Sequence, residues 1–243
     1  MPYQVLAPET EPCVWMCAGL ISYRLCDRGF DCENCPLDAA LRGPMEAGAA
    51  GPAHLDRRVA DGFFPGDRLY SAGHLWVQAL SHDDARVWRV GLDAFATALI
   101  GCTTGVRSAL QGEVVQRGDR VCEVDLGFGG LALASPVSGR FLRGNPDLAD
   151  NPHAVVTEPY GGGWIFEIEG LDPGGILGLR SAASAFQQTV LDLRRFRRSL
   201  ALRLLTASGG NGHAAADASE SLRDLRQVLC GAHYIEFLGE FIH

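Results

Sequence analysis

The chain has 243 residues, 47% of them hydrophobic and 21% charged, and its 29 acidic side chains against 21 basic ones give a net charge of −8. A chain of this length and apolar content can bury a core, which excludes a wholly disordered protein, and its acidic balance argues against nucleic acid as a partner. No apolar stretch approaches the roughly 18 residues of a transmembrane helix, and no basic and apolar leader marks secretion, so we expect a cytoplasmic protein with no membrane contact.

All 21 basic side chains are arginines, so the sequence contains no lysine. We interpret this as a compositional bias of the genome. Its chemical consequence is that no side chain carries a primary amine. This excludes Schiff-base catalysis, a P-loop lysine and any cofactor held by an amide bond to lysine.

Residues 1–42 are predicted to form a cysteine-rich module, because five of the eight cysteines fall there. Thiolates bind zinc and iron–sulfur clusters, and Cys32 and Cys35 can chelate one ion from a single turn. We predict a zinc or iron–sulfur site made by Cys13, Cys26, Cys32 and Cys35. Cys17 is left as a spare, because it stands one helical turn from Cys13 and the two would crowd one ion. Disulfides and free or redox-sensing thiols are the alternatives that the spacing leaves open.

Residues 67–178 form a predicted domain of short strands separated by turn signals. Residues 75–80 and 87–92 are typical of paired strands. Asp93 is placed to cap a helix over residues 94–100. Many short strands of this kind indicate a small barrel or sandwich.

Two further regions flank this domain. Residues 43–66, which begin with many Gly, Ala and Pro residues, are predicted to be a linker. Residues 179–243 are predicted to be helical, with a second helix beginning at Asp217. The arginines between residues 194 and 198 are interpreted as a solvated helix face. The apolar stripe over residues 234–241 is typical of a core or a dimer seam, so a homo-oligomer through these helices is one expectation.

From about Tyr70 to Pro173 the chain carries a series of motifs in a characteristic order and spacing. They are Tyr70-Ser71-Ala72-Gly73-His74-Leu75-Trp76-Val77, Val90-Gly91-Leu92-Asp93, the turn Gln111–Asp119, Ser135-Pro136-Val137-Ser138-Gly139 and Glu158-Pro159-Tyr160-Gly161-Gly162-Gly163-Trp164-Ile165. Together they resemble the glycine cleavage system H protein family of the lipoyl-domain superfamily. The resemblance implies an α+β fold with a flattened, lipoyl-like β-barrel of two small antiparallel sheets. The cysteine-rich N-terminal module and the C-terminal helices would be additions to it.

In that family a hairpin presents one lysine, which carries lipoate through an amide bond and moves an aminomethyl group between enzymes. Counting back from Pro136 places Phe128 at the lysine position. Phenylalanine has no nucleophilic nitrogen, and no shift of the alignment supplies a lysine that the sequence lacks. The resemblance therefore implies the fold and a docking surface without covalent lipoate. Phe128 has two interpretations: an apolar residue folded back on the barrel, or a hydrophobic anchor for a partner.

No Ser-His-Asp arrangement, nucleophile elbow or dinucleotide fingerprint is present, so we expect no enzymatic activity. The first hypothesis is a binding or regulatory module for a protein partner, with a cysteine-bound metal. The alternative is an electron-transfer component whose cysteine segment holds an iron–sulfur cluster. A true lipoyl carrier of the glycine cleavage system is the third hypothesis, and the missing lysine contradicts it.

Overall fold

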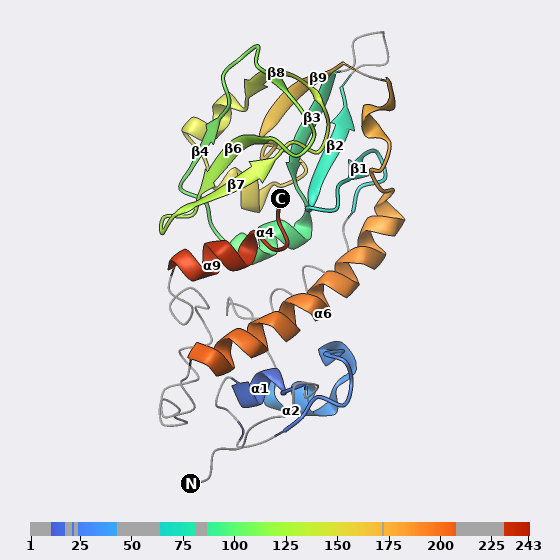
Figure 1. Cartoon of the computed structure of the whole chain (residues 1–243), viewed down its shortest axis with the longest axis vertical. Coiled ribbons are helices and arrows are strands. Elements are labelled where there is room, and N and C mark those ends of the chain that lie inside the picture. The colour runs from blue at the N-terminus through green and yellow to red at the C-terminus, as the bar shows by residue number, and fades with distance from the viewer. Residues whose placement is uncertain are drawn as a thin grey trace. The chain divides into compact units, whose positions relative to one another are not determined.

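The described residues of the computed structural model fall into two compact units (Figure 1). The barrel unit comprises residues 58–189 and 235–243, and the helical unit comprises residues 1–57 and 190–234. Most of the predicted linker, and the helix predicted to begin at Asp217, lie outside the described residues. Those described are residues 11–17, 21, 24–42, 64–80, 87–171, 173–207 and 231–243.

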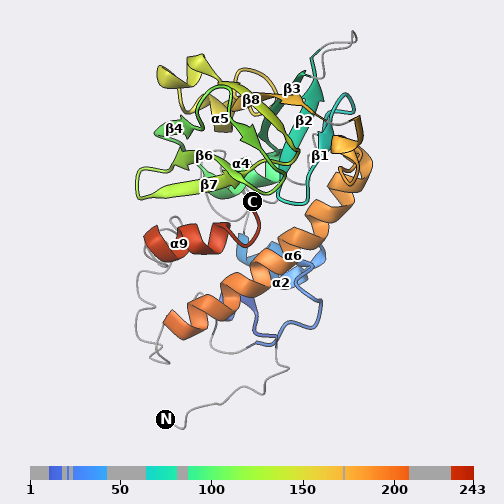
Figure 2. The ribbon, with the colours of Figure 1, turned by 45° about the horizontal axis from the view of Figure 1, so that its top comes forward.

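Two antiparallel sheets form the body of the barrel unit. The larger has six strands in the order β1-β2-β3-β9-β8-β5, and the smaller has three in the order β4-β6-β7 (Figures 1 and 2). The predicted α+β class, with its pair of small antiparallel sheets, is confirmed. The strands are β1 (Leu69–Tyr70), β2 (Leu75–Ala79), β3 (Val87–Leu92), β4 (Gly105–Ser108), β5 (Val114–Val115), β6 (Arg120–Asp125), β7 (Gly130–Ala134), β8 (Gly139–Gly144) and β9 (Phe166–Gly170).

Buried apolar side chains alternate with more exposed ones along several strands, and the buried ones form the core. In β7 the side chains of Leu131 and Leu133 are buried while their neighbours are half-buried, as expected of a strand with one face on a core. Large aromatic rings fill much of the interior, and the rings of Phe141 on β8 and Phe166 on β9 stack at 5.8 Å. Many of the apolar positions that predict short strands are buried by the sheets, whereas Leu80 and Val114 are exposed.

The helix α4 (Ala94–Ile100) begins and ends where the sequence predicts. The Asp93 carboxylate accepts a hydrogen bond from the backbone N–H of Ala96 at 3.0 Å, which satisfies a donor that the first turn leaves free. Gly101 ends the helix with a φ of +69°, a conformation that glycine adopts without steric cost. The other described helical segments that lie wholly within the barrel unit are η2 (Pro146–Ala149), α5 (Ala154–Thr157) and η3 (Pro173–Ile176).

The last residues of the chain, 235–243, belong to the barrel unit and are called the C-terminal cap below. Phe237, Leu238 and Ile242 have no exposed surface, and Phe241 lies 6.3 Å from Phe95 of α4, measured between ring centroids. The sequence predicts that the apolar stripe over residues 234–241 forms either core or a dimer seam. At these positions it forms core.

The helical unit holds the cysteine segment. Its elements are the short helices α1 (Val14–Cys17) and α2 (Pro36–Arg42), with the 3-10 turn η1 (Cys32–Asn34) between them. Helix α6 (Ala182–Ala207) starts in the barrel unit and continues into the helical unit, and α9 (Gly231–Leu238) crosses the boundary in the other direction. Within the parts of the chain that the structure describes, no helix combines the length and the apolar character needed to span a membrane.

Candidate functional site

The hairpin between β6 and β7 carries Phe128, the residue at the predicted lysine position. Asp125 pairs with Gly130 at its end, so residues 126–129 form the connecting loop. The N–H of Leu126 donates to the carbonyl oxygen of Gly129 at 2.9 Å and closes that loop. Phe128 is half-buried at the tip.

Two glycines give the hairpin tip its shape. Gly127 has a φ of +82° and Gly129 a φ of +154°, both outside the region that residues with a Cβ prefer. The N–H of Gly127 donates to the Asp125 carboxylate at 2.8 Å, and this bond lowers the pKa of Asp125. The tip therefore offers an aromatic ring, backbone groups and one ionised carboxylate. None of these groups is a nucleophilic amine.

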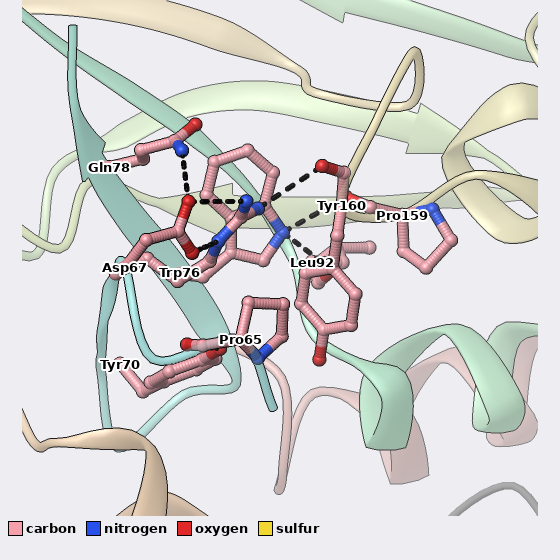
Figure 3. Close-up of polar contacts among 9 residues, drawn as sticks. Pro65, Asp67, Tyr70, Trp76, Gln78, Leu92, Pro159 and Tyr160 are labelled. Carbon is pink, nitrogen blue, oxygen red and sulfur yellow. Dashed lines mark hydrogen bonds and ion pairs between the residues drawn. The ribbon is translucent and has the colours of Figure 1, made fainter. Parts of the chain in front are cut away.

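A second cluster surrounds Arg68, next to β1 (Figure 3). Its guanidinium carbon lies 4.6 Å from the centre of the Trp76 ring and 5.2 Å from that of Tyr160, which are cation–π distances. The guanidinium donates to the Asp67 carboxylate at 2.9 and 3.2 Å and to the Tyr160 carbonyl oxygen at 3.3 Å. Gln78 donates a further hydrogen bond to Asp67 at 2.6 Å. These bonds, led by the one from Arg68, lower the pKa of Asp67.

Trp76 is the centre of this arrangement. It is fully buried, and its Nε1–H lies 3.0 Å from two acceptors, the carbonyl oxygens of Leu92 and Pro159 (Figure 3). The Arg68 cluster thus fastens the edge of the larger sheet to the segment that carries Pro159 and Tyr160. Because its cation, its carboxylate and its indole are all engaged with one another or with the backbone, the cluster supports the fold.

His74, in the first of the family-like motifs, is held between an acidic side chain and an aromatic ring. Its Nδ1 lies 2.8 Å from the Asp93 carboxylate, and its ring lies 4.2 Å from that of Phe95. His74 has a φ of +63°, which is uncommon for a residue with a side chain. The one Asp93 carboxylate therefore both caps α4 and fixes His74.

A buried carboxylate joins three strands of the larger sheet. Glu167 on β9 is 4% exposed, and its two oxygens accept hydrogen bonds from Arg89 on β3 at 2.8 Å and Arg143 on β8 at 2.7 Å. Both guanidinium groups also lie over the Trp164 ring, at 4.5 and 5.3 Å from its centre. Burial by itself would raise the pKa of Glu167, but the hydrogen bonds from the two arginines outweigh it and the pKa is lowered.

The cysteine segment is ordered by its backbone. Cys13 and Cys17 are joined through α1, where the N–H of Cys17 donates to the Cys13 carbonyl oxygen at 3.0 Å. The N–H of Cys35 donates to the Cys32 carbonyl oxygen at 3.1 Å, which forms the predicted turn of this pair. The Cys26 sulfur accepts a hydrogen bond from the backbone N–H of Phe30 at 3.2 Å.

The residues that the structure describes include all four predicted metal ligands, Cys13, Cys26, Cys32 and Cys35. Over those residues, no group of three or more His, Cys, Asp or Glu side chains is placed to hold a metal ion. The donor set suits zinc or an iron–sulfur cluster, but its arrangement here does not converge on one point. The zinc or cluster site stays a prediction from cysteine spacing.

The sequence interprets the arginines of α6 as a solvated face, which describes only part of the run. Arg195 and Arg198 are exposed, and Arg194 and Arg198 also pair with Asp31 at 3.6 Å and with Glu11 at 3.4 Å. Arg197 is 7% exposed and donates to the Phe30 carbonyl oxygen at 3.2 Å. The partners lie in the cysteine segment, far away in the sequence, so helical periodicity could not reveal them. The basic run holds the cysteine segment against the helix.

Thiol labelling distinguishes metal-free cysteines, as the structure places them, from cysteines bound to the predicted metal. Burial, together with the neighbouring Cys13 thiol, raises the pKa of Cys17 to about 12, and burial raises that of Cys122 to about 12. Because the thiolate is the reactive form, we expect iodoacetamide at pH 8 to leave these two cysteines unmodified while it alkylates the half-buried Cys13, Cys26 and Cys35. Peptide mass spectrometry measures the result. A metal on the predicted ligands would instead protect those three until a chelator is added.

Two antiparallel sheets and a tight hairpin with the half-buried Phe128 at its tip match the lipoyl-type domain that the sequence motifs predict. A family model described as "Glycine cleavage H-protein" matches residues 68–190, half of the chain. The chain belongs to the glycine cleavage H-protein family. The match includes the hairpin and all of the Arg68 cluster except Asp67, and it leaves out the cysteine segment and the C-terminal cap.

Curated relatives agree with this assignment. The chain is 35% identical over 128 residues to the glycine cleavage system H protein of Halorhodospira halophila, an alignment covering 53% of this chain and 95% of that protein. It is 33% identical over 118 residues to the H protein of Alteromonas mediterranea, covering 49% and 89%. A crystal structure of the H protein from Mycobacterium marinum aligns with a TM-score of 0.46 and 28% identity over 52% of this chain and 98% of that chain. Nearly the whole of each relative thus corresponds to about half of this chain.

Proposed function

We propose that this chain is an H-protein-like module that binds a protein of the glycine cleavage system without carrying a covalent lipoyl arm. One observation carries the proposal: the loop that closes the β6–β7 hairpin holds Phe128 between two glycines, in a sequence that contains no lysine. An amide bond to lipoate needs an amine, and neither the hairpin nor any other side chain of these 243 residues supplies one.

Family membership supports the docking half of the proposal. The relatives are named as glycine cleavage system H proteins, and the carrier role that the resemblance implies requires contact with the enzymes of that system. The barrel of that family is present here, and the amine that would hold the lipoyl arm is not. A protein of this kind would bind an enzyme of the system without accepting the aminomethyl group from it.

Phe128 is the residue that we assign to the contact. Its ring is half-buried at the hairpin tip, between two glycines. Aromatic side chains that insert into a partner's pocket contribute much of the binding energy of an interface. Of the two interpretations of Phe128, we therefore propose the hydrophobic anchor.

A binding experiment on lipoylation-treated protein tests both halves. The protein is incubated with a lipoate-attaching enzyme, lipoate and ATP, its intact mass is measured, and its binding to the glycine decarboxylase of a lipoylated relative is followed by biolayer interferometry. We expect an unchanged mass and saturable binding, which Phe128→Ala weakens about tenfold. Leu110→Ala, at an exposed apolar position elsewhere on the barrel, should leave binding unchanged. A lipoyl adduct on the wild-type chain, or no binding, would overturn the proposal.

A further inference from the structure

The C-terminal cap lies against the β6–β7 hairpin as well as against α4. The contact is close: a Cβ added to Gly129 would overlap the Cδ1 atom of Ile235, the first residue of the cap. Residue 129 is therefore a glycine for two reasons, its positive φ and the Ile235 side chain that covers it.

The rest of the cap is anchored in the barrel unit. Phe237 and Phe241 pack edge to face at 5.6 Å between ring centroids, and both are buried. At the far end, the N–H of His243 lies 3.4 Å from the Gly73 carbonyl oxygen, and a Cβ on Gly73 would overlap the His243 backbone. The cap is held at two places on the barrel, so Ile235 is presented to the hairpin by a fixed support.

We infer that the C-terminal cap is a device that pins the tip of the β6–β7 hairpin, so that the loop carrying Phe128 is presented to a partner in one fixed position. A tip that carries a swinging arm has to project freely. A tip that acts as an anchor gains from being ordered in advance, because less conformational freedom is lost on binding. The cap lies beyond the 68–190 match to the family, so this support is an addition to the shared fold.

The inference rests on the proposed function only in assuming that the fixed hairpin tip binds a partner. The contact itself is testable in the protein alone, without any partner or any lipoylation reaction. A failure of the cap to restrain the hairpin would therefore be distinguishable from a failure of the hairpin to bind.

Hydrogen exchange of the hairpin amides, measured on the full chain by NMR or by mass spectrometry, tests the inference. Ile235→Glu puts a charge against the hairpin, and we expect it to speed exchange of the Leu126 amide about tenfold by freeing the loop to open locally. Ala232→Glu adds the same charge at an exposed position one turn earlier on α9 and should leave that exchange unchanged.

A second variant keeps the test decisive if Ile235→Glu does not fold. Ile235→Ala removes the contact without adding charge, and we expect it to speed exchange at Leu126 by about threefold. It should also lessen the destabilisation caused by Gly129→Ala, because the added methyl then has room. Exchange at Leu126 that is unchanged in the folded Ile235 variants would overturn the inference, as would full additivity of the two substitutions.

Discussion

Replacing Trp76 with alanine should lower the free energy of unfolding by about 3–5 kcal/mol. The indole is fully buried, and its removal leaves a cavity, takes the Nε1–H from two carbonyl oxygens and removes a ring from beneath the Arg68 guanidinium. Urea unfolding followed by far-UV circular dichroism measures the change. Trp76→Phe keeps a ring and removes the Nε1–H, so it should cost about 1–3 kcal/mol.

The matched control for this prediction is a truncation on the surface of the same unit. Leu110 is 79% exposed, and Leu110→Ala should change the free energy of unfolding by less than about 0.5 kcal/mol. A loss at Trp76→Ala no larger than that of the control would show that the Arg68 cluster does not support the barrel.

Replacing Glu167 with glutamine should cost about 2–3 kcal/mol, because it removes the charge that two arginines share in a buried site. Glu169, two residues along the same strand, pairs with Arg140 at 3.8 Å and is nearly half exposed. Glu169→Gln should therefore cost less than about 1 kcal/mol. Urea unfolding of both variants at pH 7 makes the comparison, and equal losses would contradict the role given to burial.

The effect of Glu167 should depend on pH in a definite direction. Its pKa is lowered in the folded protein, so the folded state favours the ionised form more than the unfolded state does. The stabilisation is fully present above the unfolded pKa of about 4.3 and is lost as the pH falls through the lower folded value. The difference between wild type and Glu167→Gln should hence shrink below about pH 4. A difference that grows on acidification would show that the sign is wrong.

Local signals in the sequence predicted much of the barrel. Asp93 and Gly101 mark the ends of α4 because capping and a left-handed glycine are properties of a few neighbouring residues. The motif order around Pro136 and Trp164 predicted the family. The alternation of apolar residues predicted strands, although it could not say which strands pair across the larger sheet.

The contacts that escaped the sequence join residues far apart. Arg68 meets Tyr160 across 92 positions, and Arg197 meets Phe30 across 167. A charge pattern on one helix or strand gives no sign of a partner at that separation, so the sequence does not distinguish the buried Arg197 from the exposed arginines beside it. The attachment of residues 235–243 to the barrel was hidden for the same reason, since an apolar stripe does not name what it packs on.

The bond between Arg197 and Phe30 also bears on the order in which the chain matures. Phe30 leaves the ribosome 167 residues ahead of its partner, a delay on the order of ten seconds at typical rates of protein synthesis. During that interval the thiols of the cysteine segment are not yet held by α6. Any metal ion or oxidant that reacts with them then does so before this unit has folded.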